Sequence, residues 1–318
     1  MKTKIIKILK NNQNKLISGS YIAKELNITR SYVNKLVLSL IDEGYEIDTV
    51  SRSGYIYKSD IKVLNKEYIQ SNIKQQVIIF DEIDSTNNYL KKLAKEKEID
   101  NILVVSDYQT GGRGRLGRTF ISDKAKGIYM SLLARPKISI NETKKITCLT
   151  AVAINNAIKE LTNIDSKIKW VNDIYINNKK VSGILTEAQF LIEEGMLDYV
   201  IIGIGINVYK RDFDDSIKNI ATSIENEGMK ISRNKLIIKI INNINYYLDN
   251  FNKYNFMSEY QNSSCVIGRS VELNIRGSIF NAIVKEINNE GELVVITEEN
   301  KEMIVYSGEI TRMIINDK

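Results

Sequence analysis

One short stretch of the chain, Gln109 to Arg118, alternates glycine with arginine between two apolar runs. The runs, Ile102 to Val105 and Ile128 to Leu133, predict strands on either side of it. Glycine lets a backbone approach a ligand closely, and arginine supplies fixed charge and forked donors that suit carboxylate and phosphate oxygens. We therefore expect a loop that binds an anionic ligand and stays mobile until that ligand offsets the repulsion between its arginines.

Gly/Arg runs also occur in disordered RNA-binding segments and in ordinary exposed hairpin loops. The RNA-binding segments repeat the pattern and lack flanking strands, which argues against them here. An exposed hairpin loop stays open as the alternative. The stretch is not a Walker A loop, because no Gly-Lys-Ser/Thr sequence closes it.

The composition, 318 residues with 43% hydrophobic and 26% charged, is that of a soluble globular protein with two or three domains. We find no signal peptide and no run of membrane-spanning length, so we expect a cytoplasmic protein that does not enter a membrane. Cys148 and Cys265 lie in apolar segments and suggest buried thiols in a reducing compartment. Histidine is absent, which excludes His-ligated metals and a His general base. The net charge of +6 permits an anionic partner without requiring one.

Residues 1–60 predict a winged helix-turn-helix. The pattern gives three helices and then a hairpin: Lys4 to Leu9, a helix from Ser18 or Ser20 to Leu26, a helix from an N-cap at Thr29 to Gly44, and strands at Glu46 to Val50 and Tyr55 to Tyr57. Such a module lays its third helix in the major groove of DNA. The segment holds ten Lys/Arg against six Asp/Glu, a net charge of +4.

The residues that we expect to contact DNA lie near the start of the third helix and in the hairpin turn: Arg30, Ser31, Asn34, Lys35 and Arg52. The alternative is a winged helix used only for packing or for protein contacts. Residues 61–75 predict a partly helical connector to the next domain.

From Gln76 onward strands alternate with helices, which predicts a mixed sheet. We expect a strand at Val77 to Phe80, a helix from Asn88 to Lys97 capped by Asp84 or Ser85, and a long helix from Thr143 to Leu161.

The predicted strand at Lys167 to Val171 runs into Asn172 and Asp173, whose oxygens suit Mg²⁺ beside the cationic Lys169. Gly183 stands in the middle of a further strand, where a ligand or another backbone should approach closely. The Gly203 to Asn207 run lacks the third glycine and the following helix of a dinucleotide-binding site.

The last segment predicts helices at Lys235 to Leu248 and Tyr254 to Tyr260, followed by five short strands. The strands are expected at Val271 to Ile275, Ser278 to Lys285, Glu292 to Thr297, Lys301 to Tyr306 and Ile310 to Ile314. Short strands separated by Gly- and Asn-containing turns indicate a small SH3-like β-barrel.

Together these segments resemble the biotin protein ligases, and more closely the members that are also biotin-operon repressors. The matching motifs are Asp84-Ser85-Thr86-Asn87, Gln109 with Gly112 to Arg118, Lys169-Trp170-Val171-Asn172-Asp173, Lys180 to Leu185, and Gly203 to Val208. Two residues depart from the family pattern. Val171 stands where proline is usual, and Phe120 stands where tryptophan is frequent, although Phe120 can still stack on adenine or a bound ligand.

The resemblance implies an α+β protein of three parts. These are a winged helix-turn-helix at 1–60, a class II-synthetase-like catalytic domain with a mixed sheet at 76–263, and the SH3-like β-barrel at 264–318. It implies that biotin and MgATP form biotinyl-5′-AMP and that biotin then passes to a lysine of a biotin carboxyl carrier protein, of acetyl-CoA carboxylase or another biotin enzyme. It also implies operator DNA as a partner, and a homodimer when biotinyl-5′-AMP is bound.

The resemblance implies a role for each matched residue. The catalytic residues would be Lys169 and Arg115. Biotin would contact Ser85, Thr86, Asn87, Gln109, Arg113, Gly114, Arg115, Lys169 and Gly183. ATP or the adenylate would contact Arg118, Phe120, Asn172 and Asn207, and Mg²⁺ would be held by Asp173 and Asn207.

Three other functions compete with a ligase that represses transcription. They are a ligase whose winged helix does not bind DNA, a regulator that binds biotin without catalysis, and a lipoate ligase. Lys169, Asn172, Asp173 and the arginine loop argue against the regulator, and the Gly-Arg pattern argues against the lipoate ligase.

Overall fold

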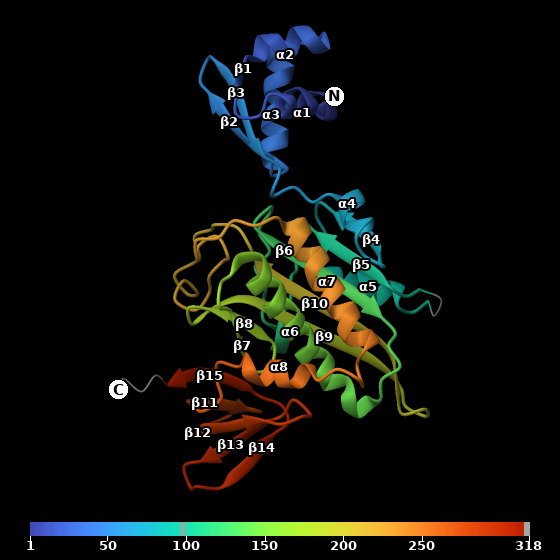
Figure 1. Cartoon of the computed structure of the whole chain (residues 1–318), viewed down its shortest axis with the longest axis vertical. Coiled ribbons are helices and arrows are strands. Elements are labelled where there is room, and N and C mark those ends of the chain that lie inside the picture. Colours follow the sequence, from blue (N-terminus) through green and yellow to red (C-terminus); the bar gives the residue numbers. More distant parts are fainter. Residues whose placement is uncertain (97–98, 315–318) are drawn as a thin grey trace. The chain divides into compact units, whose positions relative to one another are not determined.

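The computed structural model describes residues 1–96 and 99–314, which divide into two compact units. Unit 1 comprises Met1–Asn65 and Ser232–Asn234, and unit 2 comprises Lys66–Ile231 and Lys235–Lys318. Figure 1 labels their helices and strands.

Unit 1 contains three helices and a three-stranded antiparallel sheet in the order β1-β3-β2. Their bounds are α1 (Lys2–Asn11), β1 (Leu16–Ile17), α2 (Gly19–Leu26), α3 (Arg30–Asp42), β2 (Glu46–Val50) and β3 (Gly54–Ser59). The Ser18 hydroxyl accepts a hydrogen bond from the Tyr21 amide at the start of α2, and the Thr29 hydroxyl accepts one from the Tyr32 amide at the start of α3. The predicted helix-turn-helix and hairpin are confirmed.

The core of unit 1 explains why these elements pack together. Ile5 and Leu9 of α1, Ile22 of α2, and Val33 and Val37 of α3 are fully buried in one cluster. Val33 and Val37 lie one turn apart on α3, so that face is buried and the polar face is left exposed.

Unit 2 is built on a seven-stranded mixed sheet in the order β4-β5-β6-β10-β9-β8-β7. Only β4 and β5 pair in parallel, and the other neighbours are antiparallel. The bounds are β4 (Gln76–Phe80), β5 (Ile102–Ser106), β6 (Gly127–Ala134), β7 (Lys167–Lys169), β8 (Asp173–Ile176), β9 (Lys179–Leu191) and β10 (Met196–Asn207).

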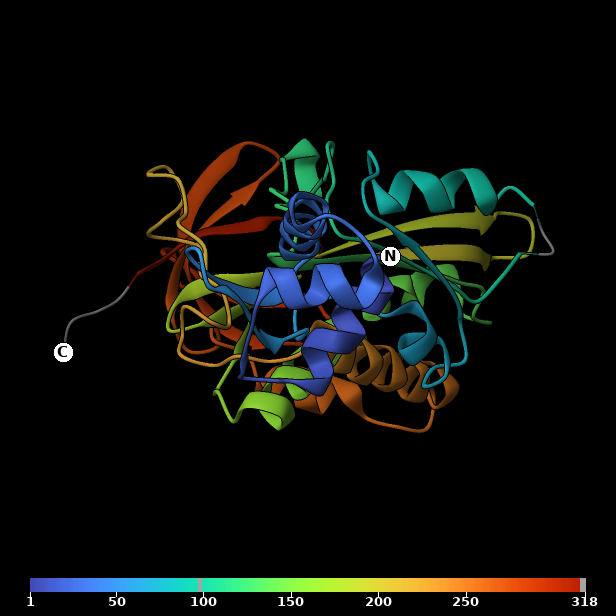
Figure 2. The same ribbon diagram turned by 90° about the horizontal axis from the view of Figure 1, so that it is seen from above.

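Helices cover both faces of this sheet (Figure 2). On one face α5 (Thr86–Leu93) buries Leu90 against Val104, Leu133 and Ile201. The other face carries the long helix α6 (Thr143–Thr162) and α7 (Arg233–Asp249), with α8 (Phe256–Asn262) beside them. The short helices α4 (Lys66–Gln70) and η2 (Ile140–Glu142) lie between these elements along the chain.

Several predicted bounds are shifted by one or more residues in the structure, and two of these shifts have a clear cause. Helix α5 begins at Thr86 rather than Asn88, because Ser85 is its N-cap; its predicted end at Lys97 lies outside the described residues. Strand β7 ends at Lys169 rather than Val171, because the chain turns at Trp170 to place Asn172 beside β9.

The C-terminal part of unit 2 is a five-stranded antiparallel sheet in the order β14-β13-β12-β11-β15. Its strands are β11 (Ser270–Ile275), β12 (Ser278–Ile287), β13 (Leu293–Thr297), β14 (Glu302–Val305) and β15 (Glu309–Ile314). All five predicted strands are present. Among the described residues β14 and β15 form the two edges and do not pair with each other, so the sheet is open rather than a closed barrel.

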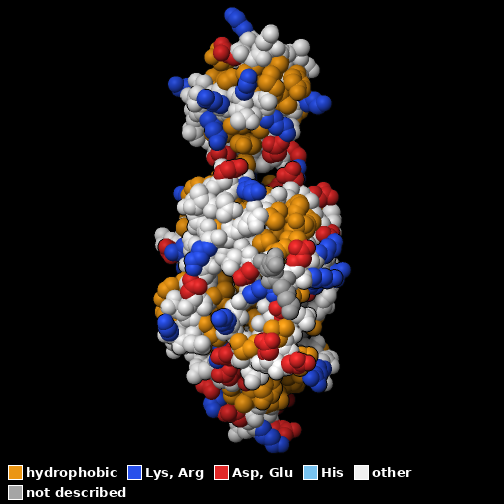
Figure 3. Space-filling view, turned by 90° about the vertical axis from the view of Figure 1, so that its right-hand side faces the viewer, with side chains coloured by type: hydrophobic (Ala, Val, Ile, Leu, Met, Phe, Trp, Pro, Cys, Tyr) orange, Lys and Arg blue, Asp and Glu red, His pale blue; other side chains and the backbone are white. Residues whose placement is uncertain are grey.

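The surface drawn in Figure 3 carries Lys/Arg and Asp/Glu side chains intermingled, with apolar side chains between them. The net charge of +6 is therefore not gathered into one basic patch on this face. Among the helices that the structure describes, none is both long and apolar enough to cross a membrane.

Candidate active site

A cavity of about 560 Å³ lies in unit 2 between the Gly/Arg loop, the start of α5, strands β7 to β10 and the start of β15. It gathers side chains that are far apart in the sequence. Every small-ligand residue predicted from the sequence lines it: Ser85, Thr86, Asn87, Gln109, Arg113, Gly114, Arg115, Arg118, Phe120, Lys169, Asn172, Asp173, Gly183 and Asn207.

The Gly/Arg loop folds back on itself as a narrow hairpin. The Phe120 amide donates to the Gly112 carbonyl at 2.9 Å, and the Gly114 amide donates to the Arg118 carbonyl at 2.7 Å. A Cβ at Gly112 would lie 2.5 Å from the Phe120 carbonyl oxygen, so the loop's own backbone requires glycine there. The mobility expected of the ligand-free loop stays a prediction.

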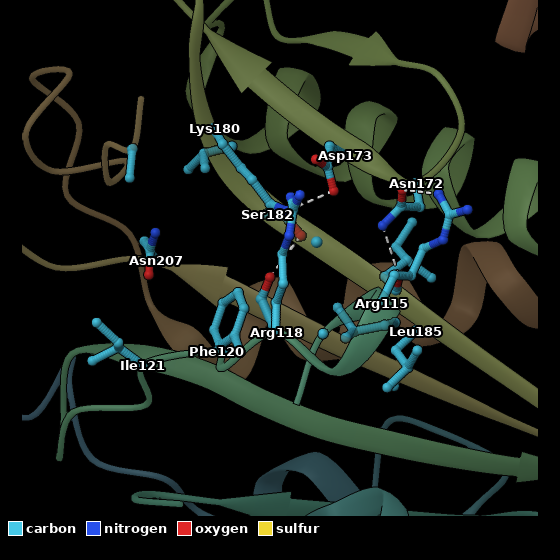
Figure 4. Close-up of a pocket in the computed structure, with 18 of the residues that line it drawn as sticks. Arg115, Arg118, Phe120, Ile121, Asn172, Asp173, Lys180, Ser182, Leu185 and Asn207 are labelled. Carbon is cyan, nitrogen blue, oxygen red and sulfur yellow. Dashed lines mark hydrogen bonds and ion pairs between the residues drawn. The ribbon is translucent and has the colours of Figure 1, made fainter. Parts of the chain in front are cut away.

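Two arginines of the loop already have partners in the cavity. Arg115 donates through Nη1 to Asn172 Oδ1 at 2.9 Å (Figure 4). Arg118 forms a bidentate ion pair with Glu309 at the start of β15. The Arg118 Nη2 to Glu309 Oε2 distance is 2.7 Å. Because Glu309 lies 191 residues from Arg118, the sequence pattern contained no signal for this partner.

Lys169 stands at the end of β7 with its ammonium largely removed from water. Its Nζ lies 3.3 Å from the Tyr175 hydroxyl and 5.2 Å from the centre of that ring. Burial lowers the pKa of Lys169, and the charge of Asp173 opposes that shift. Burial in turn raises the pKa of the Tyr175 phenol, so Tyr175 stays neutral beside the cation.

Lys180 is a cavity residue to which the sequence analysis gave no role. Its Nζ lies 2.7 Å from Asp173 Oδ1, and Figure 4 shows the side chain reaching across the cavity to that carboxylate. A Cβ at Gly183 would lie 3.1 Å from Lys180 Nζ. The structure thus places the Lys180 side chain close to Gly183, whereas the close approach of a ligand there stays a prediction.

The predicted Mg²⁺ ligands do not form a complete metal site by themselves. Within residues 1–96 and 99–314 no group of three or more Cys, Asp or Glu side chains could hold a metal ion. Asp173 is paired with Lys180, and Asn207 lies apart from it and donates to the Thr222 carbonyl at 3.0 Å (Figure 4). Since Mg²⁺ bound with a nucleotide takes most of its ligands from phosphates and water, one such carboxylate is sufficient.

A polar cluster joins the start of α5 to the loop and the sheet. The Thr86 amide donates to Gln109 Oε1 at 2.9 Å, Gln109 Nε2 donates to Ser122 Oγ at 3.0 Å, and Ser131 Oγ lies 2.6 Å from Thr86 Oγ1. Ser131 and Ser122 were not predicted. A serine inside the apolar run Ile128 to Leu133 was the available signal for Ser131.

The two glycines of the Gly203-Ile204-Gly205 run make room for this site. A Cβ at Gly203 would overlap the Asn87 amide, and a Cβ at Gly205 would lie 2.5 Å from the Phe120 ring. The same ring meets Tyr129 edge to face at 6.2 Å. Side chains two residues apart on a strand share a face, so the pattern opens one continuous face of β10.

The segment after β10 adds cavity residues that the sequence analysis missed. Arg211 stacks over the Phe213 ring at 4.7 Å and pairs with Asp123 at 2.9 Å. Ile217, Ile220 and Ala221 follow in the cavity wall. No motif distinguishes these residues in the sequence.

In unit 1, four of the five residues predicted to contact DNA line one shallow concavity between α3 and the β2–β3 turn: Arg30, Ser31, Asn34 and Arg52. Arg30 Nη2 donates to the Arg52 carbonyl at 3.4 Å, which links the helix to the turn. Lys35 is exposed but lies outside that lining.

Comparison with known proteins agrees with this division. Residues 79–207 match the biotin/lipoate A/B protein ligase family, and residues 2–56 match an HTH domain. The bifunctional ligase/repressor BirA of Bacillus subtilis is 35% identical over 96% of this chain and 97% of its own length. The chain belongs to the biotin/lipoate A/B protein ligase family.

Other family members show the same relationship. BirA of Escherichia coli is 27% identical over 92% of this chain and 91% of its own length. The biotin protein ligase of Aquifex aeolicus, solved with biotin and ATP, superimposes with a TM-score of 0.64 at 29% identity, covering 76% of this chain and 100% of that one.

The contact between Gly205 and Phe120 gives a testable consequence. Gly205→Ala should push the Phe120 ring from its place and destabilise the protein by about 1–3 kcal/mol, the usual cost of overpacking. Urea unfolding would measure this. In a Phe120→Ala background the same Gly205→Ala change should cost far less; an equal cost in both backgrounds would show that the strain lies elsewhere.

Proposed function

We propose that this protein is a biotin protein ligase that also represses transcription of biotin genes. It makes biotinyl-5′-AMP from biotin and ATP and transfers biotin to a lysine of a biotin carboxyl carrier protein, and it acts in the cytoplasm with that partner. The observation that carries the proposal is one cavity in which the three arginines of the Gly/Arg loop and Lys169 converge beside a polar cluster, in a chain of this family.

Adenylation joins two anions, and this defines what the cavity must do. A carboxylate oxygen of biotin attacks the α-phosphorus of ATP, the bond to the β-phosphate breaks, and diphosphate leaves. Fixed positive charge offsets the repulsion between carboxylate and phosphate, and the charge acts strongly where water is excluded. Arg115 and Lys169 are the groups that we assign to this role.

The remaining residues divide between the two substrates. We assign the ring urea of biotin to Ser85, Thr86, Asn87 and Gln109, and its neighbouring groups to Arg113, Gly114 and Gly183. We assign the adenylate to Arg118, Phe120, Asn172 and Asn207. The hydrogen-bonded cluster around Thr86 and Gln109 supports the first assignment, and the Phe120 ring over Gly205 supports a stacking surface for the second.

Mg²⁺ would enter with ATP, held mainly by phosphates and water, and would neutralise charge on the leaving diphosphate. Asp173 is the residue that we assign to it, with Asn207 as a second oxygen donor. Lys180 would then release Asp173, since one carboxylate oxygen cannot serve both cations equally well.

In the second half-reaction the amine of a carrier lysine attacks the acyl carbon of the mixed anhydride, an amide bond forms, and AMP leaves. Ordering of the Gly/Arg loop over the adenylate would exclude water from that anhydride. We assign residues 76–263 to catalysis, with the connector at 61–75 before them. We assign residues 264–318 to an SH3-like fold, which the five antiparallel strands support.

The second activity belongs to residues 1–60. We propose that α3 reads an operator through Arg30, Ser31, Asn34 and Lys35, with Arg52 on the DNA backbone. The adenylate-bound form would be a homodimer that brings two such helices to an inverted repeat. Unbiotinylated carrier protein would consume the adenylate and so relieve repression.

The alternatives differ in measurable ways. A ligase with an unused winged helix would biotinylate its carrier and bind no operator, whereas a pure regulator would bind biotin without forming an adenylate. A lipoate ligase would activate lipoate in preference to biotin.

Biotin-dependent exchange of labelled diphosphate into ATP tests the ligase. We expect exchange with Mg²⁺ and biotin together, and labelling of a carrier domain when that domain is added. Lipoate in place of biotin is the control. No exchange above the biotin-free background would disprove the ligase.

The lowered pKa of Lys169 predicts a pH dependence. The ammonium is present below that pKa and is lost as pH rises through it, so adenylation should slow at a lower pH than an exposed lysine would require. Lys169→Arg keeps its charge and should remove this alkaline decline. Lys169→Ala should raise the barrier by about 2.7–4 kcal/mol. Lys167, a half-buried lysine two residues earlier on β7 that pairs with Asp165, supplies the control, and Lys167→Ala should change neither property.

The proposed repressor activity requires that the protein bind DNA upstream of biotin genes. This binding should strengthen with biotinyl-5′-AMP and weaken steeply with salt. A fluorescence anisotropy titration, with sedimentation of the same samples, would measure binding and dimerisation together. Arg30→Ala should weaken operator binding while diphosphate exchange stays unchanged. If the protein binds no DNA either with or without the adenylate, the repressor activity is disproved and only the ligase remains.

A further inference from the structure

The Asn87 amide contacts residues of three adjacent strands of the sheet, β6, β10 and β9. Gly203 of β10 lies against it, and a Cβ there would overlap Asn87 Oδ1. Ser131 Oγ of β6 donates to Oδ1, and Asn87 Nδ2 donates to Glu187 Oε2 of β9 at 2.8 Å. Asn87 is only 7% exposed, so its orientation is set by these neighbours rather than by water.

The Glu187 carboxylate determines which way the Asn87 side-chain amide is turned. A carboxylate accepts hydrogen bonds and cannot donate them, so only Nδ2 can face it. Glu187 is itself held by Lys91, whose Nζ lies 2.7 Å from its other oxygen, Oε1. Asn87 and Lys91 are four residues apart on α5, so one helix face holds both ends of the carboxylate.

The orientation of the Asn87 amide determines the direction of the neighbouring hydrogen bonds, because each hydroxyl of the cluster has one proton to donate. With Asn87 Oδ1 turned toward β6, the Ser131 hydroxyl gives its one proton to Asn87 and has none for Thr86. The Thr86 hydroxyl then directs its own proton to Ser131 Oγ at 2.6 Å or to Gln109 Oε1 at 3.1 Å. Either way its proton stays within the cluster, and what remains for a ligand at Thr86 Oγ1 and Asn87 Oδ1 is acceptor capacity.

We propose that Glu187 is a positioning residue that fixes this cluster as acceptors, so that the site takes the ring N–H donors of a cyclic urea. The inference rests on the biotin site proposed above and deepens it. An apolar residue at 187 would let the Asn87 amide turn over, which would present Nδ2 to Ser131 and reverse the order of donors. Biotin affinity would fall although Glu187 need not touch biotin.

The test is titration calorimetry of the full-length protein with biotin, without ATP, and the KM for ATP in diphosphate exchange. Glu187→Met should weaken biotin binding at least tenfold and leave the KM for ATP within twofold. Glu187→Gln has the same shape, but Lys91 would hold its amide oxygen and leave the Nε2 donor facing Asn87, so this variant should also weaken biotin binding. Lys91→Met removes the ion pair but keeps the Asn87 bond, and should change biotin affinity less than twofold.

A double-mutant cycle separates positioning from general destabilisation. In an Asn87→Ala background, Glu187→Met should have no further effect on biotin affinity, because the amide it orients is gone. If Glu187→Met does not fold, Ser131→Ala replaces it: this removes the donor at the other end of the amide, and it too should weaken biotin binding at least tenfold with the KM for ATP unchanged.

The outcomes are distinct. Wild-type protein that binds no biotin would overturn the proposed function itself. Wild-type binding with unchanged affinity in Glu187→Met, or in Ser131→Ala where that variant replaces it, would overturn the positioning role alone. Equal losses in Lys91→Met and Glu187→Met would also overturn it, since the ion pair rather than the hydrogen bond would then be responsible.

Discussion

The site depends on the absence of side chains along one face of β10. Gly203 accommodates the Asn87 amide and Gly205 accommodates the Phe120 ring, so a helix terminus and a loop both reach the sheet at that face. Glycine weakens a strand because it is flexible and packs nothing. Here β10 lies between β6 and β9 and pairs with both. This central position stabilises a glycine-containing strand that would be unstable at the edge of the sheet.

The sequence was sufficient to predict elements whose causes are local. The caps at Ser18 and Thr29, the long helix at Thr143, and the five strands of the tail follow from periodicity and turn residues within a few positions. Fourteen of the residues that line the cavity were also predictable, because the Gly/Arg loop and the Lys169 motif are recognisable patterns.

What could not be predicted is which partner each of these residues meets. Glu309 holds Arg118 from the far end of the chain, and Glu187 holds Asn87 across 100 residues. Only the topology of the sheet brings them together. Lys180 was visible in its motif, but its pairing with Asp173 depends on the space left by Gly183. The edges of the C-terminal sheet are a similar case, since strand positions do not determine whether a sheet closes.

The positive charge of the ligand-free cavity is partly neutralised by carboxylates of the cavity itself. Arg118 is matched by Glu309 and Lys180 by Asp173, while Arg115 rests on a neutral amide. An incoming anion that takes Arg118 or Lys180 therefore exchanges one ion pair for another, and the carboxylate it displaces must find water or a cation. The free energy of anion binding is therefore the difference between the energy of the new ion pair and that of the ion pair it replaces. Selectivity among anions then rests on shape and hydrogen-bond direction more than on total charge, and binding should respond to ionic strength less than the number of cations would suggest.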